Sequence, residues 1–99
     1  MIHEIATLTI TPGSEKEFEE AAAQAVPYFQ QAAGALSFRL DRTVENPSEY
    51  TLTVGWASVE DHTEGFRNSP GFTKWRELVS PHFAEAPRVK HVQHAYTGF

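Results

Sequence analysis

Histidines are the residues of this sequence best suited to acid–base chemistry or metal binding. His62 lies in the first turn of a predicted helix, and imidazole titrates near neutral pH, so it is the main candidate for a general acid or base. A packed or partly solvated histidine is the alternative at this position. His91 and His94 are three residues apart on a predicted strand and point to opposite faces, which argues against joint metal binding. The sequence has no HExxH motif, facial triad or clustered carboxylate pair, and no partner is evident for His3 or His82, so we expect no metal site.

Aromatic side chains recur along the chain and could form the walls of a pocket for a flat ligand. Their faces stack on planar rings, and indole and phenol groups can donate hydrogen bonds. The members of this set are Tyr28, Phe29, Phe38, Trp56, Phe66, Phe72 and Trp75. The same residues would also make an adequate core, so both roles stay open at this point. Arg76 follows Trp75 directly and could reach the mouth of such a pocket or lie on a solvated helix face.

Composition excludes several classes of partner and chemistry. The chain has 99 residues, enough for one domain spanning residues 1–99, and 13 acidic against 8 basic residues give a formal charge of −5. Such a chain repels phosphate backbones and anionic lipids, so we expect no nucleic-acid or membrane partner. The absence of cysteine excludes disulfides, thiolate metal sites and a cysteine nucleophile. No signal peptide or long apolar run is present, which favours a cytoplasmic location.

Alternation of apolar and polar residues predicts strands that could position these groups. Residues 2–11 alternate, with Glu4 and Ile5 as exceptions, and a Pro-Gly pair follows them. Residues 36–41 and 50–57 alternate on either side of an Asn-Pro-Ser turn, which predicts an antiparallel hairpin. The apolar faces of these three strands are expected to lie under the helices. They comprise Leu8, Ile10, Leu36, Phe38, Leu40, Leu52, Val54 and Trp56.

Capping signals predict two helices between the strands. Ser14 with Glu17 three residues later is a capping-box arrangement, and we expect this helix to end at Gly34 in a left-handed conformation. Ser58 caps a second helical stretch, and Ser69-Pro70 restarts it, because proline is favoured at the first helical position behind a serine cap. The second helix is therefore predicted in two parts.

The predicted order is β-α-β-β-α-β, with residues 88–97 as the fourth strand. This is the split βαβ motif of an α+β ferredoxin-like fold, whose right-handed crossovers place both helices on one face of a four-stranded antiparallel sheet. The opposite face is rich in threonine and serine. It could face water or a second sheet.

Several segments resemble the antibiotic biosynthesis monooxygenase family over nearly the whole chain. They are Ile10-Thr11-Pro12-Gly13-Ser14 with Phe18, Gly34-Ala35-Leu36, Trp56-Ala57-Ser58-Val59-Glu60-Asp61-His62, Phe66-Arg67-Asn68-Ser69-Pro70 and Phe72-Thr73-Lys74-Trp75. The resemblance implies a homodimer that forms an α/β barrel from two sheets. It also implies oxygenation of electron-rich polycyclic phenols or quinols without metal, haem or flavin. An aromatic phenolate can itself give an electron to oxygen, provided that the protein orients it and excludes water.

From this resemblance we predict a cofactor-free monooxygenase that acts on a small electron-rich aromatic such as a polyphenol, anthrone or quinol. Trp56 matches a pocket position of the family, and we expect it to act with His62 in catalysis. The expected substrate contacts are Tyr28, Phe38, Phe66, Phe72, Trp75 and Arg76. The tyrosine, asparagine and arginine that characterised oxygenases place around this tryptophan have no clear counterpart here. A non-catalytic dimeric module that binds a small aromatic ligand is the alternative.

Other functions of similar folds fit the residues less well. The haem-degrading branch of the superfamily uses an asparagine, a tryptophan and a haem-ligating histidine, where this chain has Ala6, Phe66 and Arg76. An RNA-recognition domain would want exposed aromatics on the sheet and basic flanks, but this chain is acidic. Acylphosphatases place a phosphate-cradling loop and an arginine after the first strand, where this sequence has Thr11-Pro12-Gly13-Ser14-Glu15.

Overall fold

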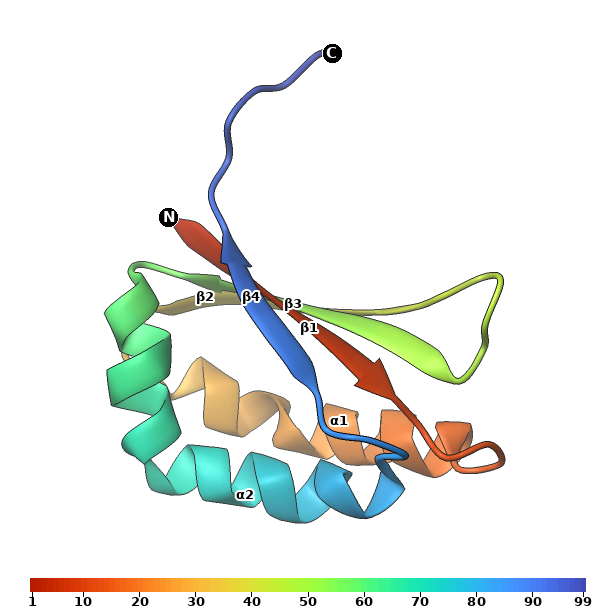
Figure 1. The fold of residues 1–99 in the computed structure, drawn as a ribbon. Helices are drawn as coiled ribbons and strands as arrows, with labels where there is room; N and C mark the ends of the chain where they lie inside the picture. Colours follow the sequence, from red (N-terminus) through yellow and green to blue (C-terminus); the bar gives the residue numbers. More distant parts are fainter.

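The alternating N-terminal residues form one of the two inner strands of a four-stranded sheet in the computed structural model, which describes residues 1–99 (Figure 1). The main elements are β1 (Ile2–Thr9), α1 (Glu15–Gln30), β2 (Ala35–Arg42), β3 (Glu49–Trp56), α2 (Pro70–Val79) and β4 (Arg88–Val92). Short helical turns lie between them: the π-helical η1 (Asp61–Gly65) and the 3-10 turns η2 (Phe66–Asn68) and η3 (Ser80–His82). The predicted order and the two-part second helix are therefore confirmed.

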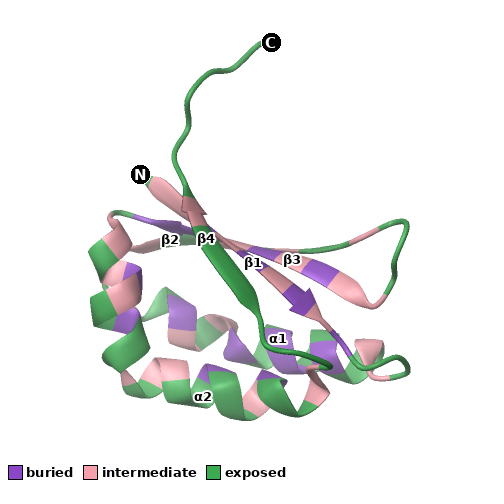
Figure 2. Cartoon of the chain, viewed as in Figure 1, coloured by how far each residue is buried: buried purple, intermediate pink, exposed green.

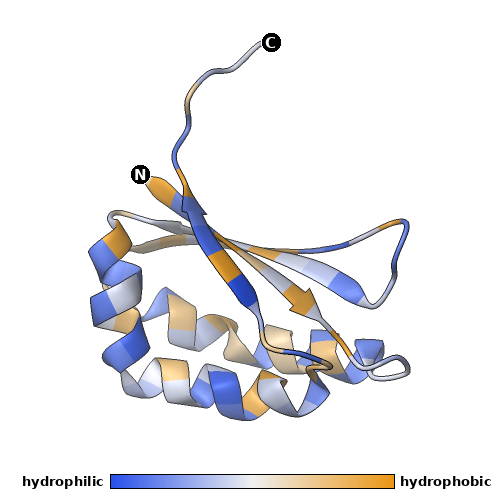
Figure 3. Cartoon of the chain, viewed as in Figure 1, coloured by the Kyte–Doolittle hydropathy of each residue, from blue (hydrophilic) through white to orange (hydrophobic).

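The sheet has the strand order β2-β3-β1-β4, and each pair of neighbours is antiparallel. Both helices cover the same face of the sheet, as the ferredoxin-like prediction requires (Figure 1). Buried residues gather between the two layers, whereas the edge strand β4 is largely exposed (Figure 2). Hydrophobic and hydrophilic positions likewise alternate along α1 and α2 (Figure 3).

Leu36 was predicted to face the helices, and this is wrong. The residue is 57% exposed, because the pairing of β2 with β3 is irregular between Ala35 and Ser37. Ala35 pairs with Trp56 and Ser37 with the next residue back along β3, so Leu36 is an extra residue that points outward. Phe38 returns to the inner face, where it packs against the core. A one-residue bulge thus changes which side of the sheet an apolar residue occupies.

The serine caps differ between the helices. Ser69 accepts a hydrogen bond from the Phe72 amide at 3.4 Å, which confirms the predicted restart of the second helix. Ser14 precedes α1 but its side chain makes no capping hydrogen bond, so the predicted capping box is wrong. Glu15, the first residue of α1, instead links the helix start to its surroundings: its carboxylate accepts hydrogen bonds from the Gly13 amide at 2.9 Å and from the Ser48 hydroxyl at 2.7 Å. The helix start is therefore tied to the hairpin that joins β2 to β3.

Gly34 adopts the predicted left-handed conformation, with φ of +81°, but α1 already ends at Gln30, so the predicted helix end at Gly34 is wrong. A Cβ atom at this position would collide with the Asp61 side chain at the start of η1. The Gly34 carbonyl also accepts a hydrogen bond from the Ala57 amide at 2.8 Å. Glycine here lets the turn after α1 pack closely against the segment that carries His62.

The fourth strand is shorter than predicted. It ends at Val92, which pairs with His3 of β1. Only Ile2 precedes His3 in β1, so little of that strand is left to pair with. Strand pairing therefore stops where its partner runs out, and residues 93–99 extend away from the sheet with Tyr96 and Phe99 exposed (Figure 1). None of the helices combines the length and the apolar character needed to cross a membrane.

Candidate functional site

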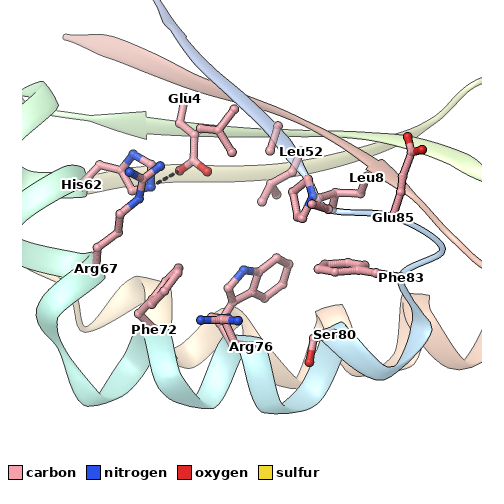
Figure 4. Close-up of a pocket in the computed structure, with 15 residues that line it drawn as sticks. Glu4, Leu8, Leu52, His62, Arg67, Phe72, Arg76, Ser80, Phe83 and Glu85 are labelled. Carbon is pink, nitrogen blue, oxygen red and sulfur yellow. Dashed lines mark ion pairs between the residues drawn. The ribbon is translucent and has the colours of Figure 1, made fainter.

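A cavity of about 450 Å³ lies between the inner face of the sheet and helix α2 (Figure 4). Strands β1, β3 and β4 form one wall, and α2 and the loop that leads into β4 form the other. The lining residues are Glu4, Ala6, Leu8, Leu52, His62, Arg67, Phe72, Trp75, Arg76, Ser80, Phe83, Glu85, Ala86, Pro87 and Val89. Most of this surface is apolar, and the buried polar groups lie at one end.

A hydrogen-bonded cluster of Glu4, His62 and Trp56 occupies that end. The Glu4 Oε1 atom accepts a hydrogen bond from the Trp56 indole at 3.1 Å and lies 3.3 Å from Nε2 of His62. Glu4 and His62 are only 5% and 3% exposed, and Trp56 is fully buried. The imidazole also stacks on the indole, with 5.4 Å between ring centroids and an interplanar angle of 16°. Two independent contacts thus hold the His62 ring in place.

Strand parity brings Glu4 into the cavity. Side chains on one face of a strand are two residues apart, so Glu4 shares the inner face of β1 with Ala6 and Leu8. His62 comes from the π-helical turn η1, a rare conformation that is frequent at functional sites. Ser58 positions this turn by accepting a hydrogen bond from the Asp61 amide at 3.2 Å.

His91 extends the cluster toward the surface. It pairs with Glu4 across β4 and β1, so both side chains project from the same face of the sheet. Its Nε2 atom lies 2.8 Å from Nδ1 of His62, and its side chain is partly exposed. His94 lies beyond the end of β4, where its ring contacts the Thr97 hydroxyl. The structure therefore separates the two C-terminal histidines.

Burial shifts the protonation of both central groups. Desolvation raises the pKa of Glu4, and the Trp56 hydrogen bond and the Arg67 charge only partly oppose this effect. Desolvation lowers the pKa of His62 to about 4, and Arg67 and His91 add to the shift. His62 is consequently a neutral imidazole at neutral pH, and Glu4 is a stronger base than an exposed carboxylate.

Two arginines lie at the cavity surface. Arg67 comes from η2, and its side chain reaches toward His62 (Figure 4). The Arg76 guanidinium lies over the Phe72 ring, 5.9 Å from its centroid. Both residues are exposed, so they can carry positive charge at the opening of the cavity without a desolvation penalty. No group of three or more His, Cys, Asp or Glu side chains is arranged to hold a metal ion.

The structure brings together some of the predicted site residues and separates others. His62, Phe72, Trp75 and Arg76 line the cavity, and Trp56 lies behind its polar end. Phe66 is buried in the core, where it packs against Phe29 and Trp56. Phe38 and Tyr28 line two other hollows, one between α1 and β2 and one between α1 and the start of α2. Roles in binding or catalysis stay predictions for all of them.

Among the site residues that sequence reasoning missed, Glu4 and His91 contact His62 directly. Glu4 had a visible signal, because it is a charged residue at an apolar position of an alternating strand. An inward carboxylate must find partners or remain protonated, which makes it a candidate for chemistry. His91 had no comparable signal, since its contact with His62 depends on the pairing of β4 with β1.

Comparison with known proteins places the chain in a family. Residues 1–78 match the family model described as antibiotic biosynthesis monooxygenase. The uncharacterized protein YczJ of Bacillus subtilis is 39% identical over 93 residues, which cover 94% of this chain and 98% of YczJ.

Solved structures agree with this assignment. A candidate antibiotic biosynthesis monooxygenase from Bordetella bronchiseptica is 44% identical, with a TM-score of 0.94 over 96% of this chain and 97% of that chain. SnoaB, a cofactor-independent oxygenase from Streptomyces nogalater, shares the fold with a TM-score of 0.83 at 16% identity, over 98% of this chain and 95% of SnoaB. The chain therefore belongs to the antibiotic biosynthesis monooxygenase family.

Proposed function

We propose that this protein is a cofactor-independent monooxygenase that acts on a small electron-rich aromatic, such as a polyphenol, anthrone or quinol, within the cavity. The confinement of the buried polar side chains Glu4 and His62 to one end of a largely apolar cavity carries this proposal. A flat ligand can lie against Phe72 and Trp75 and point its hydroxyl group toward the buried carboxyl. Deprotonation makes such a ring electron-rich enough to react with O₂ directly.

The overall reaction balances without an external reductant. Oxidation of a phenol to a quinone consumes one O₂: one oxygen atom becomes the new carbonyl, and the other leaves as water with two hydrogens from the substrate. Trp56 and His62 are the proposed catalytic pair, with Trp56 holding both Glu4 and the His62 ring in place. Arg67 and Arg76 supply positive charge near the phenolate.

Oxygen uptake tests the proposed activity. Purified, metal-free protein should accelerate O₂ consumption with at least one member of a panel of anthrones, hydroquinones and catechols, and ¹⁸O₂ should label one product oxygen. Ala86→Trp, at an exposed lining position, should lower the rate roughly tenfold to hundredfold by obstructing the cavity. Ala84→Trp is the matched control, because Ala84 is an exposed neighbour outside the cavity lining. Ligand binding without uptake would favour the non-catalytic binding module instead.

We further propose that residues 1–99 form one domain that pairs with a second copy through the outer face of the sheet. Leu36 is exposed, and Tyr96 and Phe99 extend from the body without contacts to cover them. A second copy would bury these apolar groups. Sedimentation equilibrium at micromolar concentration should give twice the chain mass, and a mass of one chain contradicts the proposal. The expected cytoplasmic location stays a prediction.

A further inference from the structure

We propose that Glu4 accepts the proton of the bound substrate and that His62 and His91 pass it to the solvent, so that the three residues form a proton relay out of the cavity. This inference rests on the proposed function, because it assumes a substrate that binds as a phenol and reacts as a phenolate. It adds two residues, Glu4 and His91, to the catalytic pair proposed from the sequence.

Contacts between the three side chains form an unbroken path. Oε1 of Glu4 lies 3.3 Å from Nε2 of His62, and Nδ1 of His62 lies 2.8 Å from Nε2 of His91. Each residue comes from a different element, and exposure increases along the path from the buried Glu4 and His62 to the partly exposed His91 on the edge strand. The path therefore joins the polar end of the cavity to the surface through the two nitrogens of one imidazole.

The chemistry of a neutral imidazole suits the middle position. It carries one N–H donor and one acceptor nitrogen, so it can take a proton on one side and release one on the other. The lowered pKa of His62 keeps it neutral at neutral pH, whereas a stable imidazolium there would hold the proton. The raised pKa of Glu4 makes it the better first acceptor.

The charged and titratable groups around His62 come from three elements. Glu4 faces it from β1, His91 from β4 and Arg67 from η2. Arg76 on α2 and Glu85 in the loop before β4 line the cavity as well. The Arg67 guanidinium repels a proton on His62 and attracts the negative charge that the departing proton leaves on the substrate.

The transfer is a shift of hydrogens along the path. The substrate hydroxyl gives its proton to Glu4, and Glu4 passes a proton to Nε2 of His62. The hydrogen on Nδ1 of His62 moves to Nε2 of His91, and the hydrogen on Nδ1 of His91 moves to water. The substrate loses one proton, the solvent gains one, and no residue changes its charge. Both imidazoles end in the opposite tautomer, which must reverse before the next transfer.

Proton release in the absence of oxygen tests the relay separately from oxygenation. The probe is 4-nitrophenol, whose phenolate is coloured, mixed with the protein at a pH about one unit below the pKa of the free ligand. A second dye reports protons that reach the solvent. The wild type should form phenolate and release protons at the same rate. Because oxygenation is excluded, failure of the proposed monooxygenase activity would leave this result intact.

Three variants separate the steps. Glu4→Gln keeps acceptor and donor groups near Trp56 and His62 but cannot take a proton, so it should form no phenolate. His91→Gln should slow proton release roughly 100-fold, and added imidazole should restore it, because the site is partly exposed. His94→Gln is the matched control and should behave as the wild type. Thermal unfolding should confirm that all three fold.

The relay is overturned by any of three outcomes. Phenolate formation in Glu4→Gln at the wild-type level would show that another group takes the proton. Unchanged proton release in His91→Gln, or slow release that imidazole does not rescue, would place the exit elsewhere or reduce His91 to a structural role. Absence of phenolate in the wild type would remove the premise that this cavity deprotonates phenols.

Discussion

Replacing Trp56 by alanine is expected to lower the free energy of unfolding by about 3–5 kcal/mol, the usual range for truncating a buried aromatic side chain. Trp56 is fully buried and lies against both His62 and Phe66. Trp56→Phe keeps much of the ring contact but removes the indole N–H, so it should cost roughly 1–3 kcal/mol. Urea unfolding monitored by circular dichroism measures both values.

The role of the indole N–H can be isolated with a double-mutant cycle. Glu4→Gln removes the buried negative charge but keeps a hydrogen-bond acceptor for Trp56. A hydrogen bond from the indole N–H to a neutral amide is weaker than one to a carboxylate. Trp56→Phe should therefore lower the free energy of unfolding by less in the Glu4→Gln background than in the wild type. Equal costs in the two backgrounds would mean that Trp56 acts by packing alone and does not stabilise the charge of Glu4.

Acidification from pH 6.5 to about 4 is expected to destabilise the fold through His62 by about 3 kcal/mol. Burial lowers the pKa of His62 from its ordinary value of 6.5 to about 4, so the unfolded chain binds this proton at a higher pH than the folded chain does. The stability contributed by neutral His62 is complete above pH 6.5, falls as the pH drops, and changes no further below about pH 4. The free energy of unfolding across this range is the measurement.

Comparison with variants assigns this effect to His62. His62→Gln should lose most of the dependence between these pH values, whereas His94→Gln, at an exposed position, should keep it. Glu4 has the opposite effect on the pH dependence of stability. Its pKa is raised in the folded protein, so the stability that protonated Glu4 contributes is lost as the pH rises through the pKa of the folded state. A pH profile of His62→Gln that matches the wild type would contradict the assignment to His62.

Local signals predicted the elements because they depend on neighbouring residues. The alternation that forms β1 and the Ser69-Pro70 helix start were both readable from short segments, as was the left-handed Gly34. Errors arose where a second segment intervened. Glu15 accepts hydrogen bonds from the Gly13 amide ahead of α1 and from Ser48 in a distant turn, and the bulge at Leu36 depends on how β2 meets β3.

The cavity was only partly predictable. His62, Phe72, Trp75 and Arg76 were selected from residue type and helical position, and all four line it. Phe38, by contrast, was selected from its residue type and its place on the apolar face of a strand, but it lines a different hollow beside α1. Aromatic character shows that a residue prefers burial; which buried space it borders depends on how the two layers pack.

The sequence by itself determined the order of the elements, the faces of most strands and the family, because periodicity, caps and short motifs are local properties. Only the tertiary structure decided that Glu4, His62 and His91 meet. These residues come from β1, η1 and β4. The register of β4 on β1 places His91 opposite Glu4, and η1 brings His62 into contact with both. Strand register is a long-range property, and a shift of one residue would turn His91 to the outer face of the sheet.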